Sequence, residues 1–218
     1  MSPDTDLAQL EARLRAPAGD GWDEPGYDDV VQRALAAAEA EGVADVTWTE
    51  HDAPTGRLLL AATERGVVAI GLLHHDQLLE VLSEKVSPRV VRGSGRVDGL
   101  RHQLDEYYEG RRHEFDVPLD WALSSGFRRQ ILGELVQVPY GQVVSYQELA
   151  MRAGNPKASR AVGSAMATNP LPIVVPCHRV IRTDGSIGQY GGGVPMKVAL
   201  LELEGAQLPG RGGQATLL

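Results

Sequence analysis

The chain has 218 residues, of which 43% are hydrophobic and 23% are charged, a composition typical of globular proteins. It has no apolar run of the roughly 18 residues that span a bilayer, and its acidic N-terminus lacks the apolar core of a secretory signal. The single cysteine excludes an internal disulfide and any zinc site built on several cysteines. Because a lone thiol stays reduced most readily in the cytoplasm, we expect a cytoplasmic protein that does not bind membranes.

The net charge of −8 is unevenly distributed. Residues 1–123 carry a net charge of −12, whereas residues 124–218 carry +4. A basic C-terminal part is a weak indication of a polyanionic partner such as nucleic acid. Charge alone equally allows that the acidic part only keeps the protein in solution.

The first 120 residues predict an acidic leader and a small α/β domain. Residues 1–45 form the leader, in which 27–42 have helical periodicity. The domain covers residues 46–120. Its expected elements are strands at 46–52, 56–63 and 66–73, a helix at 76–86, an edge strand at 87–93 and a longer helix at 95–112.

After a linker at 121–123, the pattern changes to short helices in a second domain at 124–210, followed by a flexible tail at 211–218. A helix from residue 126 should stop before Pro139, and the last helix is expected at 197–205. Two helices at 145–154 and 158–169, joined by a short turn, predict a helix-turn-helix. Ser145 and Glu148 predict a capping box at the start of the first of them. The second is rich in small residues, which suits either close approach to DNA or tight internal packing.

The only cysteine, Cys177, lies in the stretch "LPIVVPCHRVIR" with His178 directly after it. An imidazole that accepts the thiol proton would make this cysteine a nucleophile, and a carboxylate would orient the imidazole. The downstream carboxylates are Asp184, Glu202 and Glu204, and helical spacing allows at most one of the last two to face inward. The residues alone leave this choice open. A small buried cysteine beside a structural histidine is the simpler alternative.

The stretch "GNPKASRAVGSAMATNPLPIVVPCHRVI", followed by "GSIGQYGGG", resembles the O6-alkylguanine-DNA alkyltransferases. The resemblance runs without a gap from Pro139 to Ala206 and extends more loosely through the preceding domain. It implies an α+β fold, in which a small ribonuclease-H-like α/β domain precedes a mostly helical, winged-helix-like alkyltransferase domain.

The resemblance also implies direct DNA repair. The alkyl group of O6-alkylguanine, and of O4-alkylthymine, would move irreversibly to Cys177 after the base is flipped out through the minor groove. This suicide reaction consumes one protein per lesion and needs no cofactor and no metal. The implied partner is double-stranded DNA, bound by a monomer that can assemble cooperatively.

The family pattern assigns catalytic roles to four residues. Cys177 accepts the alkyl group, His178 is the base and acts through a water, and Glu204 orients the histidine. Tyr146 donates a hydrogen bond to guanine N3 and helps to push the nucleotide out.

Other positions match the family's binding residues. Arg160 would fill the gap in the base stack, with Ser159 and Ala161 beside it on the DNA. Asn169 would brace the turn before the cysteine, and the carbonyl of Val180 would accept from the guanine amine. The substrate pocket would be completed by Tyr190, Gly191 and Met166. The family often has a polar residue where Gly191 lies, and the cysteines that hold zinc in some members are missing here.

Three other functions compete with this interpretation. A cysteine hydrolase would turn over repeatedly on an ester or amide. A non-catalytic binder of damaged DNA would lack the cysteine, which is present. A transcriptional helix-turn-helix would need base-reading side chains along its second helix, where only Ser159, Arg160 and Asn169 are available.

Overall fold

The computed structural model describes residues 33, 37, 42–93 and 95–207. The predicted helix at 27–42 and the leader lie almost entirely outside these residues, and the tail at 211–218 lies wholly outside them. No helix in the described part is long and apolar enough to cross a membrane.

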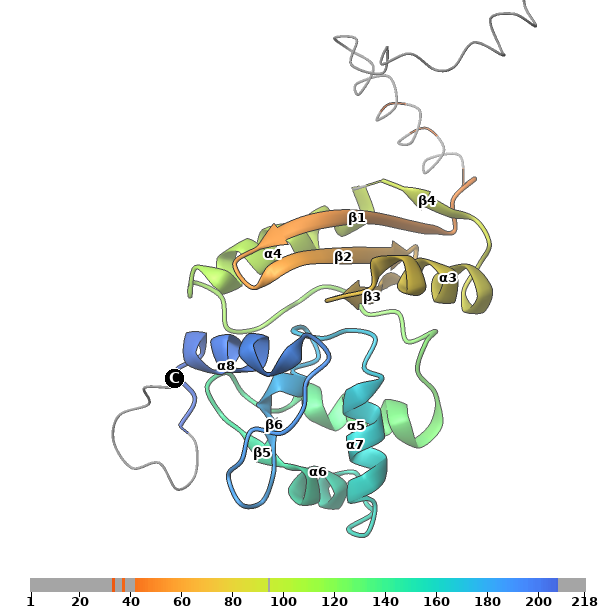
Figure 1. The fold of residues 1–218 in the computed structure, drawn as a ribbon. Helices are drawn as coiled ribbons and strands as arrows, with labels where there is room; N and C mark the ends of the chain where they lie inside the picture. The colour runs from red at the N-terminus through yellow and green to blue at the C-terminus, as the bar shows by residue number, and fades with distance from the viewer. Residues whose placement is uncertain (1–32, 34–36, 38–41, 94, 208–218) are drawn as a thin grey trace, which may run out of the picture.

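The N-terminal half contains a four-stranded sheet with the order β3-β2-β1-β4 (Figure 1). Strands β1 (Val46–Ala53), β2 (Gly56–Thr63) and β3 (Gly66–Gly71) are antiparallel neighbours, and the short β4 (Val90–Arg92) pairs in parallel with β1. The predicted strands and the edge strand are confirmed. Gly66 has a φ of 133°, and a Cβ there would collide with the carbonyl of Pro118, so this turn requires glycine.

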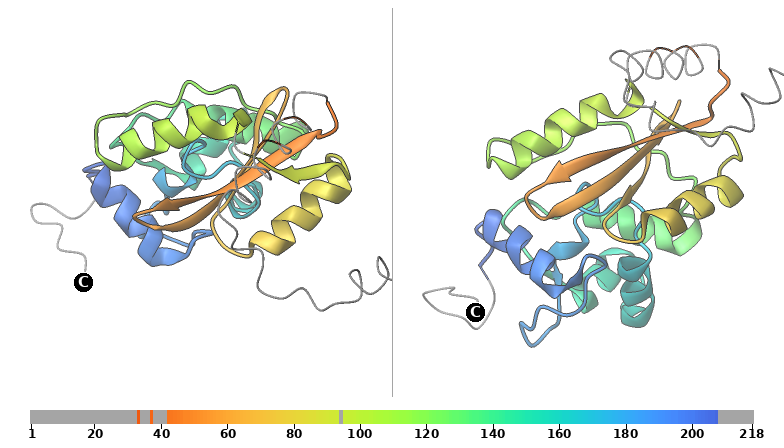
Figure 2. Two further views of the ribbon diagram at one scale, coloured as in Figure 1. Left: turned by 90° about the horizontal axis from the view of Figure 1, so that it is seen from above. Right: turned by 45° about the horizontal axis from the view of Figure 1, so that its top comes forward.

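The alternating side chains of β2 separate two apolar layers. Leu59 and Ala61 pack with Leu82 of helix α3 (His75–Lys85), while Leu58 and Leu60 pack on the other side. Helix α4 (Asp98–Tyr108) covers that other face, and Figure 2 shows the two helices on opposite sides of the sheet. The layer that contains α4 continues into the C-terminal half, so both halves share one core.

The C-terminal half is mostly helical. It contains α5 (Gly126–Val136), α6 (Tyr146–Arg152), α7 (Ser159–Ala167) and α8 (Gly193–Leu203). A two-stranded parallel pair, β5 (Val144–Ser145) and β6 (Val180–Ile181), joins the start of α6 to the segment after the cysteine. Helices α6 and α7 and the turn between them confirm the predicted helix-turn-helix. The predicted α+β fold class is confirmed as well, whereas the domain boundaries and the linker at 121–123 stay predictions.

Three local predictions need correction. Residues 95–97 form a separate 3₁₀ turn, η2 (Gly95–Val97), and α4 ends at Tyr108 rather than at 112. Helix α8 begins at Gly193, four residues before the predicted start, because Pro195 is tolerated in a first helical turn. In the predicted capping box the Ser145 hydroxyl accepts from the Glu148 N–H, but the Glu148 carboxylate pairs with Arg152 instead of returning to Ser145.

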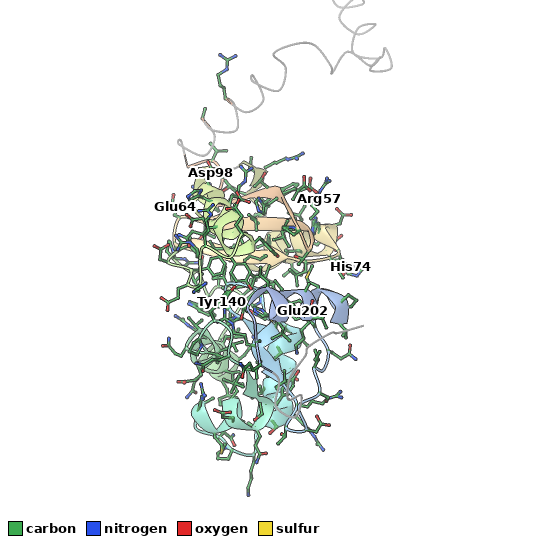
Figure 3. The ribbon with its side chains drawn as sticks, turned by 90° about the vertical axis from the view of Figure 1, so that its left-hand side faces the viewer. Arg57, Glu64, His74, Asp98, Tyr140 and Glu202 are labelled. Carbon is green, nitrogen blue, oxygen red and sulfur yellow. The ribbon has the colours of Figure 1, made fainter. Side chains whose placement is uncertain are left out.

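Helix α8 lies where the two halves meet, directly below the sheet in Figure 1. The Ile70 N–H donates to the carbonyl of Pro170 at 2.7 Å, which ties the end of β3 to the loop that precedes the cysteine. Figure 3 shows Tyr140 and Glu202 at this same level, between the sheet above and the helix-turn-helix below. The segment around Cys177 is therefore held between both halves.

Candidate active site

Cys177 begins a single 3₁₀ turn, η3 (Cys177–Arg179), that leads directly into β6. All residues from Leu171 to Ile181 are buried. The side chain of Asn169 bridges the loop before the cysteine, because its Nδ2 donates to the Val175 carbonyl at 2.8 Å and its Oδ1 accepts from the Leu171 N–H at 3.0 Å. Within this loop Ile173 has a φ of 73°, which is strained for a β-branched residue. The loop is thus held in a fixed conformation by contacts on both sides.

The Glu204 carboxylate is the centre of a buried polar cluster. Its Oε1 lies 2.8 Å from Nε2 of His178 and accepts from the Tyr107 hydroxyl at 2.7 Å. The guanidinium of Arg179 donates to both carboxylate oxygens at 2.9 Å, and the Gly141 N–H donates to Oε2 at 3.2 Å. These partners come from α4, from the turn before β5 and from η3. The carboxylate therefore connects the cysteine turn to both halves of the fold.

The charges in this cluster determine the histidine tautomer. Burial alone would raise the pKa of Glu204, but hydrogen bonds from His178 and Arg179 outweigh it and lower the pKa to about 2. Burial lowers the pKa of His178, although Glu204 opposes this shift. A neutral imidazole beside an ionised carboxylate donates its Nε2 proton to it, which leaves the lone pair on Nδ1. Nδ1 is buried and has no hydrogen-bond partner among the described residues, so it is placed to act as a base.

Cys177 rests as a protonated thiol at neutral pH. Burial raises the pKa of this thiol to about 11, and the neighbouring Asn169 side chain and Lys197 ammonium only partly oppose the shift. Lys197 is itself fully buried, and its Nζ donates to the carbonyls of Val180 and Ile187 at 2.6 Å each. Burial lowers the pKa of Lys197 to about 8. The Val180 carbonyl therefore already accepts a hydrogen bond from the Lys197 ammonium.

Three of the predicted pocket residues, Met166, Tyr190 and Gly191, lie beside the sulfur, whereas Val180 and Asn169 do not line the same cavity. A cavity of about 170 Å³ is lined by residues that include Cys177, Tyr146, Met166, Tyr190 and Gly191. Tyr146 begins α6 and is partly buried, and burial raises the pKa of its hydroxyl. The hydroxyl of Tyr190 is buried without a hydrogen-bond partner in the described part of the chain. A polar ligand could satisfy this hydroxyl beside the thiol.

The predicted DNA-contacting residues lie on the first turn of α7. Arg160 and Ala161 are exposed and Ser159 is partly buried, while Val162, Ala165 and Met166 face the core. Small residues continue along the exposed side at Ser164 and Ala167. The exposed surface of α7 therefore consists of small side chains and one arginine. Met166, on its buried face, lines the cavity.

Sequence reasoning missed three members of the site, namely Arg179, Tyr107 and Lys197. Two of them, Tyr107 and Lys197, carried a periodic signal, whereas Arg179 lies in the short η3 turn. Tyr107 continues the buried stripe of Leu100 and Leu104 on α4, and Lys197 shares one face of α8 with Leu200 and Glu204. The same spacing places Glu204 inward and leaves Glu202 exposed. In the described residues no three His, Cys, Asp or Glu side chains gather as a metal site requires.

Two family profiles match this chain. The ribonuclease-like domain of 6-O-methylguanine DNA methyltransferase matches residues 46–121, and the DNA binding domain of the same family matches 126–206. The human methylated-DNA–protein-cysteine methyltransferase is 40% identical over 181 residues, which cover 78% of this chain and 86% of the human one. A relative of the same name from Mycobacterium tuberculosis is 42% identical over 158 residues, covering 72% and 92% of the two chains.

Solved structures show the same likeness. An O6-methylguanine methyltransferase from Mycobacterium tuberculosis superposes with a TM-score of 0.62 and 36% identity, covering 76% of this chain and 96% of its own. An OGT from the same organism, solved in complex with DNA, also has a TM-score of 0.62 and 36% identity, over 72% and 92% of the two chains. The likeness therefore extends over both halves of the fold.

Proposed function

Because the chain belongs to the 6-O-methylguanine DNA methyltransferase family, we propose that it repairs DNA by moving the alkyl group of O6-alkylguanine onto Cys177. The observation that carries this proposal is the buried chain of contacts from the cysteine turn through His178 to Glu204. O4-alkylthymine presents the same kind of alkyl–oxygen bond and is a second substrate in this proposal.

In the proposed step the Cys177 sulfur attacks the alkyl carbon, so that a C–S bond forms and the C–O6 bond breaks. His178 Nδ1 takes the thiol proton through a bridging water, and the Glu204 carboxylate stabilises the imidazolium that results. Tyr146 donates a proton toward guanine N3, which makes the purine a better leaving group. In the net reaction the proton lost by the thiol replaces the alkyl group on guanine, which leaves an unmodified base in the DNA.

The thioether product explains why the reaction is proposed to occur once per chain. A thioether has no hydrolytic exit, and the sequence has no second cysteine to accept the alkyl group. The protein is thereby consumed stoichiometrically. A free thiol is needed until that single event, which favours the reducing cytoplasm as the place of action.

Access to the lesion requires that the nucleotide leaves the duplex, because O6 is otherwise stacked beyond the reach of a thiol. The small side chains on the outer face of α7 suit a minor groove only about 6 Å wide. Arg160 on its first turn would fill the gap that the flipped base leaves. DNA is thus the proposed partner, bound by monomers that can assemble side by side.

A comparison of wild type with Cys177→Ser tests the proposal. Wild type should take up a labelled methyl group from a duplex that contains O6-methylguanine, whereas the serine variant should bind the same duplex with similar affinity and take up none. Label in both proteins would exclude Cys177 as the acceptor. Continued release of a methylated small product by wild type would favour the hydrolase alternative.

A further inference from the structure

A second cavity adjoins Cys177 on the side away from α6. It has a volume of about 290 Å³ and shares Cys177, Met166, Ala167, Tyr190 and Gly191 with the first cavity. Its other walls come from the loop at 169–172 and, across the interface, from the N-terminal half. Cys177 therefore lines two cavities, of which only the smaller one is also lined by Tyr146.

The N-terminal half supplies an apolar wall to this second cavity. Ile70 of β3 and Leu72, which follows that strand, line it, and α3 contributes Leu78 and Val81. The cavity reaches the surface beside Leu73, whose exposed fraction of 53% is large for a leucine. Figure 3 shows His74, another lining residue, near the level where the two halves meet.

Gly191 lines both cavities. A Cβ at this position would lie 3.9 Å from Cδ1 of Leu72, which is an ordinary van der Waals contact with the N-terminal half. The backbone at Gly191 does not require glycine, because its φ is not positive. The absence of a side chain therefore affects the available space rather than the conformation of the loop.

We propose that this cavity, which we name the interdomain cavity, receives the distal part of long or bulky alkyl groups while their first carbon is transferred to Cys177. The inference rests on the proposed function and deepens it by naming the substrate class. The chemistry is unchanged: the C–S bond forms, the C–O6 bond breaks and the thiol proton replaces the alkyl group on guanine. The N-terminal half thereby determines the range of alkyl groups that react.

Apolar lining selects apolar substituents. Each methylene that leaves water for such a surface favours the bound state by roughly fourfold. A methyl group needs only the space next to the sulfur and gains nothing from α3. The interdomain cavity should therefore matter for an octyl group and be irrelevant for a methyl group.

The test compares single-turnover transfer rates from two duplexes of identical sequence, one with O6-methylguanine and one with O6-(n-octyl)guanine. Val81→Trp fills the cavity from α3, and Glu84→Trp places the same side chain on an exposed position of that helix outside the cavity. Val81→Trp should slow octyl transfer by about tenfold or more, because at least two methylenes of the octyl group would no longer be buried. The same variant should leave the rate of methyl transfer within about twofold of wild type. Glu84→Trp should change neither rate.

A second variant covers the case in which Val81→Trp disturbs the fold. Leu73→Glu places a charge at the exposed mouth, where the core is unaffected, and should also slow octyl transfer alone. If both variants transfer octyl at the wild-type rate, or if wild type transfers methyl but no octyl, the inference is overturned. If wild type transfers no methyl group at all, the proposed function itself fails.

Discussion

Nε2 of His178 lies 2.8 Å from Oε1 of Glu204, and both side chains are shielded from solvent. The same carboxylate neutralises the Arg179 guanidinium through two hydrogen bonds of 2.9 Å. Glu204 therefore serves two purposes, because it orients the proposed base and compensates a buried cation.

The first prediction concerns the charge of Glu204. Glu204→Gln keeps the shape of the side chain but leaves Arg179 as a buried cation without its counter-ion, which should cost about 3–5 kcal/mol in free energy of unfolding. Methyl transfer should slow as well, because the imidazolium is no longer stabilised. Urea unfolding and single-turnover kinetics measure the two effects. The control Glu202→Gln, at an exposed position in the last turn of α8, should stay within about 0.5 kcal/mol of wild type. Equal losses in both variants would contradict the role given to Glu204.

The second prediction is a loss of stability in acid. The folded protein holds the pKa of Glu204 at about 2, below its ordinary value of 4.5, and holds the pKa of His178 below 6.5. Both groups bind fewer protons when folded, so their stabilising contributions are complete at neutral pH. His178 loses its contribution as the pH falls below 6.5, and Glu204 loses about 3 kcal/mol between pH 4.5 and 2.

Measuring the free energy of unfolding from pH 7 to pH 3 tests this predicted loss of stability in acid. Glu204→Gln cannot titrate at that position and should show a flatter acid limb than wild type. If the variant lost as much unfolding free energy in acid as wild type does, other carboxylates would control the pH dependence of stability.

The third prediction concerns the reactivity of the free thiol. Because burial raises the pKa of Cys177 to about 11, only a small fraction is thiolate at neutral pH. Alkylation by iodoacetamide in the absence of DNA should be slow at pH 7 and rise about tenfold for each pH unit up to pH 9. Mass spectrometry of the protein follows this reaction. An alkylation rate that is already independent of pH between pH 7 and 8 would show that the free protein holds Cys177 as a thiolate.

The fourth prediction tests whether Arg160 acts by filling the base stack of duplex DNA or only by binding DNA in general. Arg160→Ala removes the side chain that is proposed to fill the gap in the base stack. Alkyl transfer from duplex DNA should then slow by about 10- to 100-fold, because part of the few kcal/mol that base flipping costs is no longer recovered. Transfer from single-stranded DNA should change much less, because no stack has to be opened. Arg152→Ala is the matched control, since Arg152 is also exposed on this half but pairs with Glu148. An equal loss on single and double strands would assign Arg160 to general binding only.

Much of the fold could be predicted because local patterns determine it. The apolar run in "GRLLLAAT" predicted a strand, and Ser145 marked the N-cap of α6 at the observed residue. The start of α8 was missed because a run of glycines hides the first turn of a helix whose later turns are strongly apolar. Helix ends depend on the few residues where several conformations compete.

The site was less predictable, because its contacts join distant parts of the chain. Tyr107 and Glu204 are separated by 97 residues, and nothing in one sequence pairs a tyrosine on α4 with a carboxylate after α8. Residue chemistry left Asp184, Glu202 and Glu204 open, and only the resemblance to a family favoured the last. The interdomain cavity was beyond prediction for the same reason, since its walls come from β3, α3, α7 and the loop before Cys177.

The most direct test of the central claim is the intact mass of the protein after incubation with an excess of duplex that contains O6-methylguanine. The account predicts that every chain gains one methyl group, that peptide mapping places it on Cys177, and that repair stops at one lesion per protein. An unchanged mass, a methyl group on another residue, or repair that continues beyond one equivalent would contradict it.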